Sequence, residues 1–148
     1  MRLTLWLVTL GVALVAAGGA SAAPADVVSA TTFTVPLSGP GGSGTADLRI
    51  NPSGKVCYVI KVTLSDAPQE PGPGVGNAHI HVLPNPPGAI AVDLDAAFES
   101  LGGGRYVAAD CVRGDKAVVR DILANPEQYY INVHTAAFPA GAVTGALA

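Results

Sequence analysis

The chain has 148 residues, of which 49% are hydrophobic and 13% are charged, and its formal net charge at pH 7 is −3. This length supports one domain with a core of its own rather than two. The weakly acidic balance, with eight basic and eleven acidic side chains, argues against electrostatic binding to nucleic acid or to anionic lipid.

The N-terminus has the layout of a secretory signal peptide. Arg2 supplies a positive charge, residues 3–17 carry no charge, and Ala20 and Ala22 occupy the two small-residue positions that signal peptidase reads. We therefore expect cleavage after Ala22, secretion of residues 23–148 and no stable membrane insertion afterwards. An uncleaved anchor is the alternative, but the apolar stretch is shorter than the roughly 20 residues that a spanning helix needs.

Two cysteines, Cys57 and Cys111, remain after this cleavage. In an oxidising compartment an even pair with no other partner most simply forms one disulfide bond. A metal site or a catalytic thiol is the alternative, but neither cysteine lies in a spacing typical of metal ligands. The bond would close a loop of about 55 residues. In the loop-entropy model, the lower entropy of the unfolded chain would then stabilise the folded protein by roughly 4 kcal/mol.

The sequence after the predicted cleavage site predicts an all-β domain, because short runs of alternating apolar and polar residues are separated by glycine and proline. This pattern predicts an antiparallel β-sandwich of the Ig-like or Greek-key type with one short helix. The predicted strands cover residues 32–37, 45–50, 55–64, 78–83, 89–94, 105–111, 129–134 and 142–147. The helix is predicted over 116–123, with Asp115 as its cap and Pro126 as its stop.

The remaining segments indicate loops and set the domain limits. Residues 65–77, which are rich in proline and glycine, predict a long surface loop, and residues 102–104 and 138–141 predict turns. We therefore divide the chain into a signal peptide (1–22), an N-terminal extension (23–31) and one β domain (32–148).

The three histidines, His79, His81 and His134, all fall in predicted strands. Strand side chains alternate between two faces, so His79 and His81 share one face, while Ala78, Ile80 and Val82 share the other. If the apolar faces of both histidine-bearing strands turn to the core, the three imidazoles lie together on the outer sheet face. In neighbouring strands they could then surround a copper or zinc ion.

A structural role is the alternative for these histidines, in which they bond to backbone carbonyls or to Tyr130 and Asn132 without an ion. Asp93 and Asp95 could add an oxygen ligand, although carboxylates on an exposed strand face are usually only solvated. The chain has too few histidines for a copper–zinc superoxide dismutase, and no carboxylate stands at a general-base spacing beside them. We therefore do not expect an enzyme.

Two motifs carry a resemblance to a known family. They are the sequence Ala78-His79-Ile80-His81 and the C-terminal run that contains 121–126, 129–135 and 138–145. Together they resemble the CHRD domain, the module named from chordin, over residues 32–147. Two features depart from that pattern: the glycine that usually follows the second histidine closely is delayed to Gly88, and Ala142 and Thr144 replace charged residues of the last strand.

The resemblance implies an extracellular β module with no general catalytic activity. We therefore expect a secreted, non-catalytic module that binds an extracellular protein, a glycan or a surface component through its loops. A copper- or zinc-binding protein that uses His79, His81 and His134 is the second candidate. Growth-factor binding belongs to chordin as a whole and does not follow for this chain.

Overall fold

A computed structural model of the protein describes residues 29–72, 77–84 and 88–148. The predicted signal peptide and residues 23–28 of the predicted extension lie outside the described residues. Within the described part, one sheet contains nine strands in the order β5-β4-β8-β9-β1-β2-β3-β7-β6. Every neighbouring pair in this sheet is antiparallel.

The strands are β1 (Thr31–Gly39), β2 (Gly42–Asn51), β3 (Lys55–Leu64), β4 (Ala78–Val82), β5 (Ile90–Asp93), β6 (Glu99–Gly102), β7 (Arg105–Arg113), β8 (Tyr129–Val133) and β9 (Val143–Ala146). The helices are α1 (Lys116–Ala124) and the short 3₁₀ turn η1 (Pro126–Gln128).

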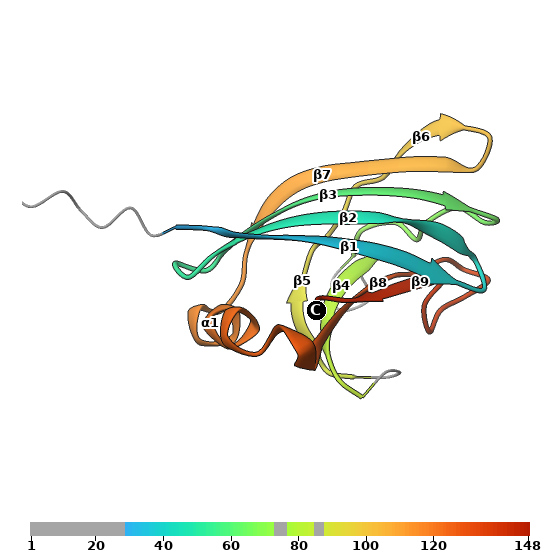
Figure 1. Ribbon diagram of the computed structural model, residues 1–148. Coiled ribbons are helices and arrows are strands. Elements are labelled where there is room, and N and C mark those ends of the chain that lie inside the picture. Colours follow the sequence, from blue (N-terminus) through green and yellow to red (C-terminus); the bar gives the residue numbers. More distant parts are fainter. Residues whose placement is uncertain (1–28, 73–76, 85–87) are drawn as a thin grey trace, which may run out of the picture.

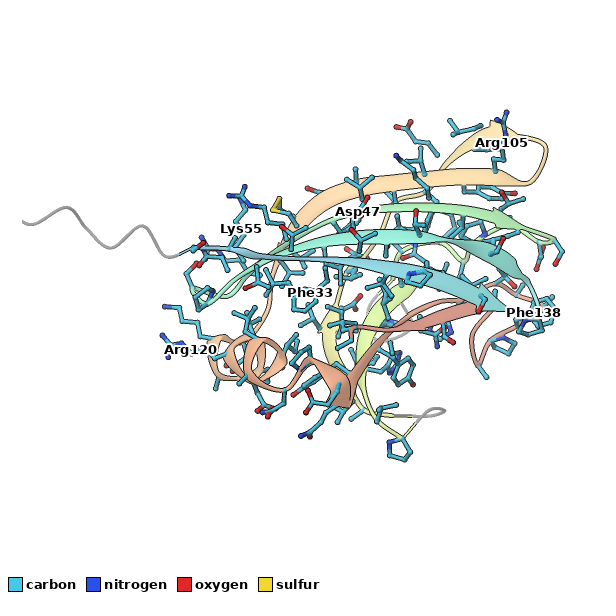
Figure 2. All side chains as sticks on the ribbon, in the orientation of Figure 1. Phe33, Asp47, Lys55, Arg105, Arg120 and Phe138 are labelled. Carbon is cyan, nitrogen blue, oxygen red and sulfur yellow. A yellow bond between two sulfur atoms is a disulfide. The ribbon has the colours of Figure 1, made fainter. Side chains whose placement is uncertain are left out.

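The sheet curls so that β1, β2, β3 and β7 lie over β4, β5, β8 and β9 (Figure 1). The two parts are continuous because β9 pairs with β1, where Ser38 lies opposite Thr144. Alternate apolar residues from both parts point inward and form one core. Its largest fully buried members are Leu48, Ile50, Ile60, Ile80, Leu94, Ile122 and Ile131. Asp47 lies on the outer surface of the sheet (Figure 2), where its Oδ1 accepts a hydrogen bond from Thr34 Oγ1 at 2.8 Å.

Helix α1 lies beside one end of the curled sheet (Figure 1). The Asp115 carboxylate caps it by accepting hydrogen bonds from the N–H groups of Ala117 and Val118, at 2.8 and 3.1 Å. Val119 and Ile122 on its inner side are fully buried. The helix therefore extends the core and lies directly before η1 and β8.

The predicted all-β antiparallel fold with one short helix is confirmed, and the eight predicted strands are present, one of them (55–64) with the predicted bounds and the others with shifted ends. The Ig-like or Greek-key sandwich is not confirmed, because the described strands belong to a single curled sheet. Strand β6 was not predicted. Its four residues are all exposed at the sheet edge, so the burial that produces an alternating pattern is missing there.

Cys57 and Cys111 form the predicted disulfide bond. They lie directly opposite each other in the register of β3 and β7. Their neighbours Val56 and Tyr58 point into the core, so the bond lies on the outer face of the sheet, where Cys111 is exposed. The bond therefore fastens two adjacent strands from outside the core.

Candidate functional site

The sheet brings all three histidines together on one face. Strands β4 and β8 are neighbours, and their register places His79 opposite Asn132 and His81 opposite Tyr130. His134 directly follows β8, and its backbone N–H donates to the carbonyl of Asn77 at 2.8 Å. The predicted alternation holds in both strands, since Ile80 and Ile131 belong to the core cluster on the opposite face.

The histidine face is buried, which differs from the open outer face that we expected. His79, His81 and His134 are only 3%, 6% and 8% exposed. Loops cover this face: the Gln69 N–H donates to the His134 carbonyl at 3.0 Å, and Gly88 bonds to the ring of His81. Sequence periodicity could not reveal this, because it reports which side chains share a face and not what packs over them.

One ligand nitrogen from each imidazole lies within 4.8 Å of the other two. Among the described residues, these three histidines form the group that could hold a metal ion. We call the group the histidine centre. Its ring centroids are 5.1 Å apart for His79 and His134, and 5.2 Å apart for His79 and His81.

Two of the imidazoles are oriented by backbone carbonyls. His81 Nδ1 lies 2.9 Å from the carbonyl oxygen of Gly88, and His134 Nδ1 lies 2.9 Å from that of Pro139. A carbonyl oxygen can only accept, so Nδ1 carries the proton in both rings and Nε2 carries a lone pair instead. The Nε2 atom of His81 is buried and has no hydrogen-bond partner.

Gly88 lies in the loop between β4 and β5 and connects this loop to His81 of β4 and Tyr130 of β8. Its carbonyl accepts from His81, while its N–H donates to the Tyr130 hydroxyl at 3.4 Å. Tyr130 in turn stacks on the His81 ring, with centroids 5.0 Å apart and planes inclined by 12°. A Cβ atom at position 88 would overlap the carbonyl oxygen of Val82, so only glycine fits this approach. The delayed glycine of the sequence is therefore brought back beside the second histidine.

The His79 ring lies between His134 and Asp93. Its Nδ1 is 3.2 Å from Nε2 of His134, and its Nε2 is 3.7 Å from Oδ1 of Asp93. Burial lowers the pKa of His79 to about 4; the Asp93 carboxylate opposes this shift, and the other two imidazoles add to it. Burial also lowers the pKa of His134. Both rings are therefore neutral at pH 7, the state in which imidazole binds metal ions.

The arrangement matches the requirements of a nitrogen-ligated metal site. Metal-binding imidazoles usually donate their other N–H group to a carbonyl or carboxylate, as His81 and His134 do. Zn–N bonds of about 2.0–2.1 Å place two ligands of a tetrahedron roughly 3.3 Å apart. The nitrogens of His79 and His134 are already near that separation, whereas an ion would draw in the most distant nitrogen. The same 3.2 Å contact also serves as a hydrogen bond without an ion.

Sequence reasoning identified the three histidines but not the groups that orient them. The carbonyls of Gly88 and Pro139 carry no side-chain signal, and the sequence marked Gly88 only as a departure from the family pattern. Asp93 was considered as an oxygen ligand; it lies beside His79 but outside the histidine centre. Its position opposite His79 depends on the pairing of β4 with β5, which the sequence alone did not reveal.

A comparison with known families supports the resemblance noted in the sequence. A family model described as the CHRD domain matches residues 20–147 of this chain. The chain belongs to the CHRD domain family. The match to the CHRD domain begins within the predicted signal peptide and includes all three histidines and both cysteines. No curated protein and no solved structure matches the chain.

The family and the structure are compatible with an extracellular location. Membership of the CHRD domain family suggests an extracellular module, and a disulfide bond is typical of proteins in oxidising compartments. In the described part of the chain, no helix is both long and apolar enough to span a membrane.

Proposed function

We propose that this CHRD domain is a secreted, non-catalytic module whose histidine centre binds one copper or zinc ion. The observation that carries the proposal is the convergence of three buried imidazoles, two of which backbone carbonyls hold in the tautomer that leaves Nε2 without a proton. His81 Nε2 is buried without a partner, and such an atom costs free energy unless a ligand satisfies it.

The ligand atoms favour a transition metal ion over calcium or magnesium. Calcium and magnesium take oxygen ligands, whereas neutral imidazole nitrogen suits zinc and copper. The centre contains three nitrogens and no carboxylate. We therefore expect zinc and copper ions to bind and calcium ions not to bind.

The burial of the centre supports a binding role rather than catalysis. Hydrolytic zinc sites keep an open coordination position and a general base near it. Here the three histidines are at most 8% exposed, and the nearby carboxylate of Asp93 faces the ring of His79 instead. These features support the proposal that the protein is not an enzyme.

A bound ion would also hold the loops that surround it. His81 bonds to Gly88 at the end of one loop, and His134 bonds to Pro139 in the turn before β9. Long loops are common sites of recognition. We propose that these loops contact an extracellular protein, a glycan or a surface component, with the ion fixing their conformation.

Metal titration of the tag-free mature protein tests this function. We expect one equivalent of Zn(II) or copper to bind, measured by isothermal titration calorimetry and by native mass spectrometry, with no binding of Ca(II). His81→Ala and His81→Gln should both lower the affinity at least tenfold. Glu99→Ala, which removes an exposed carboxylate on β6, should bind as the wild type does. No binding at one equivalent, or equal binding by the His81 variants, contradicts the proposal.

Export has a separate test. N-terminal sequencing of the protein recovered from the medium of secreting cells should begin at Ala23. A protein that starts at Met1, or that stays in the membrane fraction, contradicts the proposed processing.

A further inference from the structure

His79 is the one member of the histidine centre that no backbone carbonyl orients. Carbonyls fix the protonated nitrogen of His81 and of His134, as described above. The nitrogens of His79 instead face His134 on one side and Asp93 on the other, at 3.2 and 3.7 Å. Its Nε2 atom is buried and makes no hydrogen bond.

The neighbouring rings determine where the proton of His79 lies in the metal-free protein. His134 Nδ1–H donates to Pro139, so its Nε2 can only accept. His79 Nδ1 must therefore donate to His134 Nε2, which leaves His79 Nε2 without a proton. A lone pair that faces a carboxylate oxygen cannot form a hydrogen bond, and this explains the long 3.7 Å separation.

Binding of an ion would reverse this arrangement. An ion between His79 Nδ1 and His134 Nε2 needs both lone pairs, so Nδ1 must lose its proton. The neutral ring then carries a proton on Nε2, which faces the carboxylate of Asp93. One proton passes from Nδ1 to solvent and one passes from solvent to Nε2, so the charge of the ring does not change.

Asp93 is placed to accept from this new N–H group. Antiparallel pairing of β4 and β5 puts it directly opposite His79. Its Oδ1 also accepts from the N–H of Asp95 at 3.0 Å, which restrains the carboxylate. The Asp93 side chain is 38% exposed, compared with 4% for His79, so the carboxylate keeps its contact with solvent beside the buried ring.

We propose that Asp93 is the positioning residue of the histidine centre, accepting from His79 Nε2–H so that His79 binds the ion through Nδ1. This inference rests on the proposed metal binding. It predicts a mixed ligand set, with Nδ1 from His79 and Nε2 from His81 and His134. The separation of 3.7 Å should shorten to a hydrogen-bond distance of about 2.8 Å when the ion binds.

NMR of the imidazole nitrogens tests the change of tautomer directly. Two-bond ¹H–¹⁵N correlation spectra of histidine-labelled protein should show His79 as Nδ1–H without metal and as Nε2–H with one equivalent of Zn(II). His81 and His134 should remain Nδ1–H in both states. Coordination of zinc through His79 Nε2, or an unchanged His79 tautomer, would overturn the inference.

Variants of Asp93 test its contribution to affinity. Removing a carboxylate that accepts a hydrogen bond from a metal-binding imidazole usually lowers metal affinity by about 10- to 100-fold. We expect Asp93→Asn and Asp93→Ala to weaken zinc binding in this range. Asn retains an oxygen for the Asp95 N–H, so this variant separates the loss of the carboxylate from a change in the turn. Asp93→Glu, which restores a carboxylate, should recover part of the affinity.

Asp95→Asn is the matched control, because it removes the same charge two residues away. Asp95 has a positive φ of 46°, which asparagine also adopts. This variant should bind zinc as the wild type does. Equal losses in both variants would indicate a general effect of charge and would reject the positioning role. If Asp93→Asn binds normally while His81→Ala does not, the inference fails and the proposed function stands; if the wild type binds no metal, the proposed function itself fails.

Discussion

Removal of the Cys57–Cys111 disulfide bond should destabilise the domain without weakening its metal binding. The two cysteines are separated by 54 positions, and the loop between them contains β4, β5 and β6. Closing a loop of this size lowers the entropy of the unfolded chain by an amount worth about 4 kcal/mol at 25 °C. That is a large part of the roughly 5–15 kcal/mol that stabilises a typical domain.

The double variant Cys57→Ser/Cys111→Ser isolates this effect. The bond lies on the outer face of the sheet, so the serine hydroxyls can reach water and no cavity opens in the core. The histidine centre lies on β4 and the end of β8, whereas the bond joins β3 and β7. We therefore expect a lower free energy of unfolding and an unchanged zinc affinity of the folded protein.

Urea unfolding followed by circular dichroism and tyrosine fluorescence measures the change. Tyrosine is the suitable probe because the only tryptophan, Trp6, lies in the predicted signal peptide. The free energy of unfolding should fall by about 4 kcal/mol, and the melting temperature by roughly 15 °C. Wild type reduced with a phosphine should match the double variant. A loss below about 1 kcal/mol would refute the loop-entropy reasoning, and weaker zinc binding would show that the bond also shapes the histidine centre.

Two further changes have defined outcomes. Gly88→Ala places a methyl group against the Val82 carbonyl and displaces the carbonyl that accepts from His81, so the zinc affinity should fall by at least about tenfold. Gly72→Ala is the control, because its added methyl group meets no described atom within 4 Å. Equal zinc affinities of the two variants in calorimetric titrations would contradict the proposed role of Gly88. Burial and the hydrogen bond to Asp121 raise the pKa of Tyr129 to about 12. The contribution of this shift to the free energy of unfolding is therefore complete below pH 10 and decreases, by up to roughly 3 kcal/mol, as the pH rises toward 12. Urea unfolding across this range should show a smaller decrease for Tyr129→Phe; identical pH profiles would show that the hydroxyl titrates normally in the folded protein.

The local features of the fold were predictable because they depend on residues close together in the chain. Strand alternation placed His79 and His81 on one face, and Asp115 and Pro126 marked the helix ends. The cysteine count predicted the disulfide bond. These inferences use the period of a strand, the chemistry of a cap and the pairing of two thiols, none of which requires knowledge of distant contacts.

The tertiary structure decided the properties that depend on strand order and loop packing. The pairing of β4 with β8 brought His134 to the other two histidines, and the pairing of β4 with β5 placed Asp93 against His79. The curled single sheet, rather than a two-sheet sandwich, follows from the pairing of β9 with β1.

Burial of the histidine face shows this division most clearly. With both apolar faces turned to the core, the alternation predicted that the three imidazoles share a face, but the same pattern suits an open surface and a covered one. The loops that end at Gly88 and pass through Pro139 decided the outcome, because their carbonyls bond to the rings and exclude water. Backbone carbonyls are the same in every residue, so only their positions in the folded chain reveal them as partners of a candidate metal site.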